Sequence, residues 1–170
     1  MIFNSILIAN RGEIACRIIQ TAHEMGVRCV AVYVDDDRES PYVKMADQSV
    51  RLPDDGYLDG KEIIKAAKES GAEAIHPGYG FLSENPSFAR KVIKEGLIWI
   101  GPSAYAISVM GDKLKAKEPA EKAEVPTLPM ASSSKDANKI GYPLLIKAAA
   151  GGGGKGMRIV HKSKDLNEAI

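Results

Sequence analysis

The strongest constraint on the fold is an alternation between two residue periodicities across the first hundred positions. Short apolar runs, many of them β-branched, predict five strands, at residues 6–8, 30–34, 49–52, 72–75 and 97–100. Apolar residues at helical spacing predict intervening helices, at 14–25, 60–69 and 86–95. Because regular alternation of this kind builds right-handed βαβ units, we expect an α/β fold with a mostly parallel sheet. The last strand, 97–100, is expected to be buried.

Two polar segments follow strands of this sheet. Asn10-Arg11-Gly12-Glu13 follows the first strand, and residues 76–85, which begin His-Pro-Gly-Tyr-Gly, follow the fourth. Ligands of parallel sheets bind beyond the carboxyl ends of the strands, so both segments are candidate binding loops. Each has an equally good structural explanation. Residues 10–13 resemble a turn with a helix cap, His76 can be a structural hydrogen-bonding residue, and 83–86 can begin a helix.

The character of the sequence changes after about residue 103. Two short helices are expected at 104–110 and 113–123, followed by a connector rich in Pro and Ser at 125–134. Two strands are then expected at 142–148 and 157–160, and a last helix at 164–170 capped by Ser163. We therefore divide the chain into residues 1–112 and 113–170.

A glycine-rich loop, Gly151-Gly152-Gly153-Gly154-Lys155-Gly156, joins the two predicted strands of the second part. Its G-x-G-x-x-G pattern does not open a helix, as a dinucleotide fingerprint would. In a hairpin, such a loop lays backbone N–H groups over nucleotide phosphates, and Lys155 adds positive charge. It is not a Walker A motif, because no Ser or Thr follows the lysine. The structural alternative is a flexible surface hairpin.

Two lysines are further candidates for phosphate contacts. Lys147 interrupts an apolar strand and shares a face with Leu145, so a buried lysine there would need an anion. Lys113 follows Asp112 at a predicted helix start, where a cation opposes the helix dipole unless an anion is near. The alternatives are an exposed Lys147 on a half-solvated strand and a solvated Lys113 beside Asp112.

Composition excludes several classes of partner. The formal net charge of +1 gives no electrostatic argument for nucleic acid or an anionic membrane, and no apolar run approaches the length of a membrane helix. Cys16 and Cys29 are too few for a disulfide framework or metal cluster and are expected to be small core residues. We expect a reduced, cytoplasmic compartment. No pair of carboxylates suggests a metal site.

Four motifs taken together resemble the biotin carboxylase family, which includes the biotin carboxylase components of acetyl-CoA, propionyl-CoA and pyruvate carboxylases. They occur in the family's order, at residues 8–15, 76–85, 110–113 and 147–157. The resemblance implies a Rossmann-like, pre-ATP-grasp domain over 1–112, followed by the beginning of an ATP-grasp domain over 113–170. It also implies a reaction in which MgATP and bicarbonate carboxylate biotin on a carrier protein.

The resemblance also assigns roles to residues of this sequence. Tyr79 would lie at the edge of the biotin site. It implies ATP and Mg²⁺ as cofactors, with the Mg²⁺ ligands, the catalytic base and the bicarbonate-binding Arg all beyond residue 170, so no catalytic or metal residue is assigned here. The residues expected to contact ATP phosphates, directly or as a lid, are Lys113, Lys147, Gly153, Gly154, Lys155 and Gly156.

The implied partners are a biotin carboxyl carrier protein, a carboxyltransferase subunit and a second copy bound through the N-terminal domain. Residues 130–139 are shorter than the family's usual connector, and the chain is expected to be catalytically incomplete alone. One alternative is a non-catalytic dimerisation or regulatory module. Another is a different ATP-grasp ligase resembling carbamoyl-phosphate synthetase, which residues 76–85 argue against. A mitochondrial location stays open for a eukaryotic homologue, although no transit peptide is seen.

Overall fold

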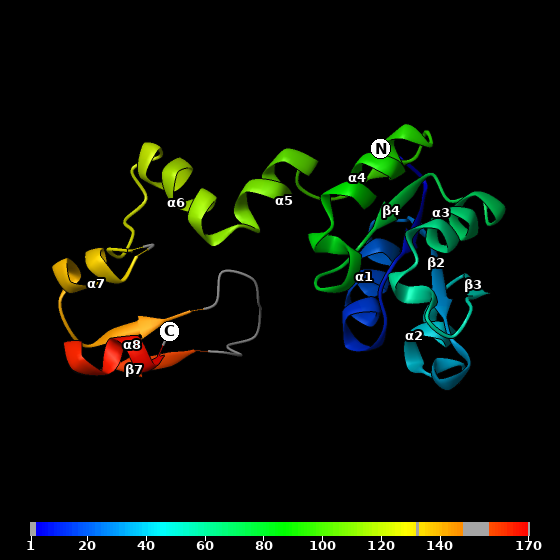
Figure 1. Ribbon diagram of the computed structural model, residues 1–170. Helices are drawn as coiled ribbons and strands as arrows, with labels where there is room; N and C mark the ends of the chain where they lie inside the picture. The colour runs from blue at the N-terminus through cyan, green and yellow to red at the C-terminus, as the bar shows by residue number, and fades with distance from the viewer. Residues whose placement is uncertain (1–2, 132, 148–156, 170) are drawn as a thin grey trace. The chain divides into compact units, whose positions relative to one another are not determined.

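The computed structural model describes residues 3–131, 133–147 and 157–169, coloured along the chain in Figure 1. The chain forms two compact units, Met1–Ser108 and Val109–Ile170. The glycine-rich residues 151–156 lie outside the described part.

The first unit is built on a five-stranded sheet of order β3-β2-β1-β4-β5 in which every neighbouring pair is parallel. This confirms the predicted α/β class. The central strand β1 is buried at all four positions, which explains why it reads as an uninterrupted apolar run. The strand bounds are β1 Ser5–Ile8, β2 Arg28–Tyr33, β3 Gln48–Arg51, β4 Ala74–His76 and β5 Ile98–Trp99.

Helices cover both faces of this sheet (Figure 1). Alternate strand residues supply two apolar clusters: Leu7 and Val30 pack with α3 and α4, whereas Ile8 and Cys29 pack with α1 and α2. Three single 3₁₀ turns connect the elements. The bounds are α1 Gly12–Glu24, η1 Asp35–Asp37, α2 Pro41–Met45, η2 Gly56–Leu58, α3 Gly60–Glu69, η3 Phe81–Glu84 and α4 Pro86–Lys94.

Side-chain caps fix where α3 and α4 begin. Asp59 accepts the backbone N–H of Lys61 at 2.7 Å, and Asn85 accepts those of Ser87 at 3.0 Å and Phe88 at 3.1 Å. The Asn85 cap confirms the helix start that the sequence offers as the structural alternative for residues 83–86. Asn85 therefore positions α4.

The last strand of the sheet is shorter and less buried than expected. β5 contains only two residues, and residues 97–100 are all half-buried. The prediction of a buried strand is wrong because β5 is one of the two edge strands of this sheet and, within the described residues, pairs only with β4.

The second unit contains short helices and one hairpin. α5, Ala104–Met110, spans the division between the units, and α6 follows at Lys113–Lys122. β6, Leu144–Ile146, pairs antiparallel with β7, Arg158–Val160, which confirms the predicted pair of strands flanking the glycine-rich loop. No helix in the described part of the chain is long and apolar enough to cross a membrane.

Two details of this unit differ from the sequence-based expectation. Helix α7, Ser134–Ile140, begins at the end of the predicted connector; the Ser133 Oγ accepts the Asp136 N–H at 3.2 Å and caps it. Ser163 does not cap the last helix. It lies in the 3₁₀ turn η4, Ser163–Asp165, before α8, Leu166–Ala169, and its Oγ bonds the Asn138 Oδ1 at 2.9 Å.

Candidate functional site

The two candidate loops of the first unit meet where β1 and β4 lie side by side. From β1 the chain adds β2 and β3 on one side of the sheet and then crosses to add β4 on the other side. The order of strands therefore reverses between β1 and β4, which is the position where such sheets bind ligands. Asn10, just after β1, is buried and donates from Nδ2 to the carbonyl oxygens of Pro77 at 2.8 Å and Tyr79 at 2.9 Å. Its Oδ1 accepts the Arg11 N–H at 2.9 Å.

The loop approaches Asn10 closely because residue 78 is glycine. Gly78 has φ +66°, and an added β-carbon would lie 2.7 Å from the Asn10 Nδ2 and 2.8 Å from Ile14. Its N–H donates to the His76 Nδ1 at 3.0 Å. Burial lowers the pKa of His76, which keeps the ring neutral and able to accept this bond. His76 therefore has the structural role that the sequence leaves open.

Tyr79 combines a backbone carbonyl that is held by Asn10 with a side chain that lies largely in solvent. The side chain is 65% exposed, and its hydroxyl lies 3.5 Å from the Glu13 Oε2. Two residues further on, Phe81 adopts φ 43° and stacks on Tyr57 with ring centroids 5.7 Å apart. An exposed aromatic ring on a well-anchored loop is suited to contact a ligand.

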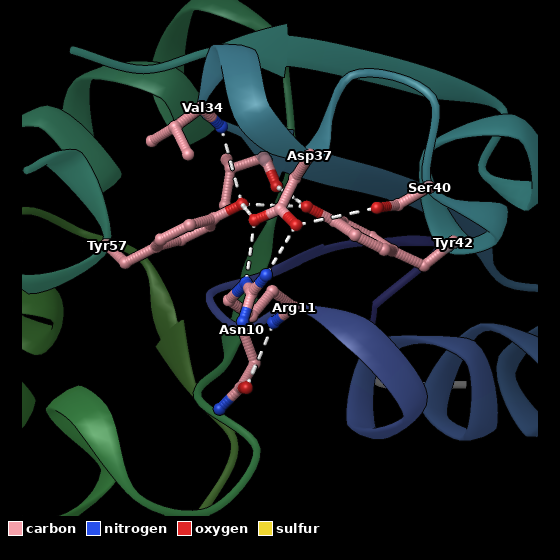
Figure 2. A network of polar contacts seen from close by, with 8 residues as sticks. Asn10, Arg11, Val34, Asp37, Ser40, Tyr42 and Tyr57 are labelled. Atoms are coloured by element: carbon pink, nitrogen blue, oxygen red, sulfur yellow. Dashed lines mark hydrogen bonds and ion pairs between the residues drawn. The ribbon is translucent and has the colours of Figure 1, made fainter. Parts of the chain in front are cut away.

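A polar network occupies the same edge of the sheet beyond β2 (Figure 2). Asp37, in η1, accepts hydrogen bonds from the Arg11 Nε at 2.6 Å and from the Arg11 Nη2 at 2.5 Å. It also accepts one from the Tyr57 hydroxyl at 2.8 Å. The Tyr57 hydroxyl oxygen lies 2.8 Å from that of Tyr42, and the Tyr42 hydroxyl oxygen also lies 3.2 Å from the Val32 carbonyl oxygen. Figure 2 shows the Tyr42 and Tyr57 rings approaching Asp37 from opposite sides.

The charges of this network set its protonation. The Arg11 hydrogen bonds hold the pKa of Asp37 below its usual range, and those bonds raise the pKa of Arg11 in turn. Burial raises the pKa of both Tyr42 and Tyr57, so both stay protonated. Reasoning from the sequence does not identify Asp37, Tyr42 and Tyr57 as a connected site. The only sequence signal for it is the run of three aspartates at 35–37 that follows β2.

A third cluster, His23, Cys29 and Asp47, lies on the α1 side of the sheet. Its ligand-type atoms are all within 4.8 Å of one another. The Asp47 Oδ2 accepts the Cys29 N–H at 2.7 Å and contacts the His23 Nε2 at 3.0 Å, while burial and Asp47 raise the pKa of the Cys29 thiol to about 11. Hydrogen bonding to the start of β2 accounts for this cluster.

The second unit places Lys147 directly after β6. The side chain is exposed, and Leu145 on the same face is 49% exposed. The interpretation of Lys147 as a lysine among buried neighbours is therefore wrong for this unit, because its two-stranded sheet leaves that face open. Lys147 directly follows β6, on the side of the hairpin that leads in sequence to the glycine-rich residues 151–156.

The other predicted phosphate contacts are Lys113 and four residues of the glycine-rich loop. Lys113 begins α6, as expected. Gly153, Gly154, Lys155 and Gly156 lie outside the described residues.

Comparison with known proteins identifies the family. Residues 2–107 match the model "Biotin carboxylase, N-terminal domain", which covers more than half of the chain. The chain belongs to the biotin carboxylase family. Residues 112–170 match "Carbamoyl-phosphate synthase L chain, ATP binding domain", in agreement with the start of an ATP-grasp domain.

Several carboxylase subunits are similar in sequence to nearly the whole of this chain. The chain is 52% identical to the mitochondrial methylcrotonoyl-CoA carboxylase subunit alpha of Dictyostelium discoideum, over 97% of this chain and 25% of that protein. It is 47% identical to the human mitochondrial propionyl-CoA carboxylase alpha chain, over 99% of this chain and 25% of that protein. The chain thus spans about a quarter of the length of these relatives.

Solved biotin carboxylases share the fold. The biotin carboxylase domain dimer of Hydrogenobacter thermophilus 2-oxoglutarate carboxylase, solved with MgADP, ADP and bicarbonate, has a TM-score of 0.91 at 43% identity, over 99% of this chain and 40% of that one. The Campylobacter jejuni biotin carboxylase has a TM-score of 0.91 at 45% identity, over 98% of this chain and 40% of that one.

Proposed function

We propose that this chain forms the N-terminal part of a biotin carboxylase that uses MgATP and bicarbonate to carboxylate biotin on a carrier protein. The observation that carries the proposal is the order of its parts. A parallel sheet with the Tyr79 loop at its carboxyl edge precedes a hairpin that flanks a glycine-rich loop, and the chain matches solved biotin carboxylases over nearly its whole length. We place the boundary between the two domains after residue 112.

In this proposal the second domain binds the phosphates of ATP. The Lys147 side chain is exposed directly after β6, and no ion pair to another described residue would have to break before its ammonium group could neutralise phosphate charge. Lys113 supplies a second positive charge. The glycine-rich residues Gly153, Gly154 and Gly156, with Lys155, close over the triphosphate and exclude water from a hydrolysable intermediate. Mg²⁺ offsets phosphate charge when bound; no residue of this chain is assigned to it.

The first domain supplies one edge of the biotin site through Tyr79. The expected partners are a biotin carboxyl carrier protein, a carboxyltransferase subunit and a second copy of the chain. The solved Hydrogenobacter thermophilus relative is a biotin carboxylase domain dimer, which supports the last of these. A cytoplasmic location remains a prediction, and several relatives are named mitochondrial.

A chimera tests the proposal most directly. The matching segment of the Hydrogenobacter thermophilus carboxylase small subunit, 45% identical over 96% of this chain, would be replaced by these 170 residues. We expect release of ADP from MgATP that depends on both free biotin and bicarbonate. Lys147→Ala should abolish it. Lys139→Ala removes an exposed lysine of the same unit that pairs only with Asp136 in the described structure, and should leave it unchanged.

The same assay separates the alternatives. A chimera that binds no nucleotide and is unaffected by Lys147→Ala would indicate the non-catalytic dimerisation module instead. The isolated chain should show no turnover, and robust turnover would contradict the view that essential residues lie elsewhere. A carbamoyl-phosphate synthetase-like activity would consume ATP and bicarbonate without biotin.

A further inference from the structure

The Asn10 side chain uses its hydrogen-bonding capacity on the loop that carries Tyr79. It is 1% exposed, both of its amide protons are donated to loop carbonyls, and its oxygen accepts the N–H of Arg11. An amide is the only side-chain group of this size that offers two donors and an acceptor together. Aspartate would direct a carboxylate at two carbonyl oxygens, and an apolar residue would leave both carbonyls without donors.

The opposite flank of the loop rests on an aromatic stack. Phe81 lies on Tyr57 with an interplanar angle of 9°, and the Arg11 guanidinium lies 6.0 Å from the Tyr57 ring centroid. Tyr57 is itself held through its hydroxyl by Asp37 at 2.8 Å. Residues 10 and 11 therefore fix the loop from both sides, Asn10 directly and Arg11 through Tyr57.

The backbone between these two anchors is held in conformations that a free loop would not select. Gly78 and Gly80 both have φ +66°, and Phe81 has φ 43°, which is unfavourable for a side chain with a β-carbon. Such a conformation persists only where surrounding contacts determine it. The Tyr79 side chain, between the anchors, is the most exposed of residues 77–81, at 65% against 42% for Phe81.

We propose that Asn10 is a positioning residue: with the Tyr57–Phe81 stack, it fixes the loop at residues 77–81 so that the Tyr79 ring is presented to a ligand at the carboxyl edge of the sheet. The identity of that ligand as biotin rests on the proposed function. The positioning itself depends only on the contacts within the first unit, so the two can fail separately.

The test uses fluorine NMR of the 170-residue chain labelled with 3-fluorotyrosine, with the Tyr79 resonance assigned by Tyr79→Phe. Asn10→Asp keeps the size of the side chain and removes both donors, and we expect it to shift or broaden the Tyr79 resonance. Phe81→Leu should do the same from the other flank. The matched control is Ser70→Ala, which removes buried side-chain hydrogen bonds to the end of α3 and should leave that resonance in place.

A wild-type Tyr79 resonance in Asn10→Asp, with only a lower urea midpoint, would overturn the proposal and leave Asn10 a purely structural residue. Should that variant fail to fold, Asn10→Ser, which keeps one hydroxyl donor, is read by the same criterion. In the chimera, Asn10→Ser should raise the KM for free biotin roughly tenfold with a smaller effect on kcat. A shifted resonance with an unchanged KM would keep the positioning and refute biotin as the ligand.

Discussion

Replacing Asp37 by asparagine measures what the polar network beyond β2 contributes to folding. The Asp37 side chain is 7% exposed, whereas that of its partner Arg11 is 48% exposed. Losing one partner of a fully buried pair costs about 3–5 kcal/mol, and losing an exposed pair costs about 0.2–1 kcal/mol. Because Arg11 can regain water and Tyr57 keeps its contact with Tyr42, we expect the free energy of unfolding to fall by about 2 kcal/mol.

Urea denaturation followed by tryptophan fluorescence measures this loss, since Trp99 is the only tryptophan and belongs to the first unit. For a unit of this size, a loss of about 2 kcal/mol corresponds to a fall in Tm of about 9 °C. The matched control is Asp35→Asn. Asp35 also binds an arginine, Arg51, through two bonds of 2.7 and 2.5 Å, but both partners are about half exposed, so its loss should be much smaller.

The pH dependence of the same difference identifies its cause. The folded protein holds the pKa of Asp37 below its value of about 3.9 in an unfolded chain. A carboxyl with a lowered pKa contributes stability above its unfolded pKa, and this contribution is lost as the pH falls through the folded value. The difference between wild type and Asp37→Asn should therefore be constant above about pH 5 and shrink below about pH 4. Equal losses for Asp37→Asn and Asp35→Asn, or a difference that persists unchanged to about pH 3, would refute the reasoning.

Three other residues of the first unit can be tested in the same protein. Burial lowers the pKa of His76, so the protein should lose stability as the pH falls below about 6.5. In His76→Asn, whose side chain cannot titrate, the urea midpoint should depend less on pH between about pH 5 and 7. Gly78→Ala should lower the free energy of unfolding by about 3 kcal/mol, because the new β-carbon would lie under 3 Å from two side chains. Gly96 also has a positive φ, +81°, but nothing within 4 Å of an added β-carbon, so Gly96→Ala should cost only about 1 kcal/mol in the same urea titration. The buried thiol of Cys29, with its pKa raised to about 11, should resist iodoacetamide in the folded protein while the half-buried Cys16 reacts. Equal rates of alkylation at the two cysteines, measured by mass spectrometry, would contradict the burial of Cys29.

The sequence predicts the sheet well because its strands differ from its helices in period. The strand β1 reads as Ile6-Leu7-Ile8 with no polar gap because both of its faces are covered by helices. The helix α3 is predicted at 60–69 and observed at Gly60–Glu69, since its apolar residues face one cluster and Asp59 caps it. Local signals are sufficient where periodicity and capping agree.

The sequence predicts less where burial depends on position in the sheet or unit. Nothing in residues 97–100 shows that β5 is an edge strand, and nothing in Leu145 or Lys147 shows that β6 belongs to a two-stranded sheet with an open face. Helix α7 could have been found, because Ser133 and Asp136 have the spacing of a capping box. The Ser-rich composition of that segment obscures the signal.

The network around Asp37 shows why a site of this kind is hard to infer from a sequence. Asn10 and Arg11 are adjacent, yet Asn10 binds the loop after β4 and Arg11 binds η1 after β2. Their side chains diverge because β1 has β2 on one side and β4 on the other. A dipeptide at the end of this strand is therefore in a position to contact the loops on both sides of it at the carboxyl edge of the sheet. The strand order, rather than either residue type, decides that role, so the same Asn-Arg pair on an edge strand could fix only one of the two loops.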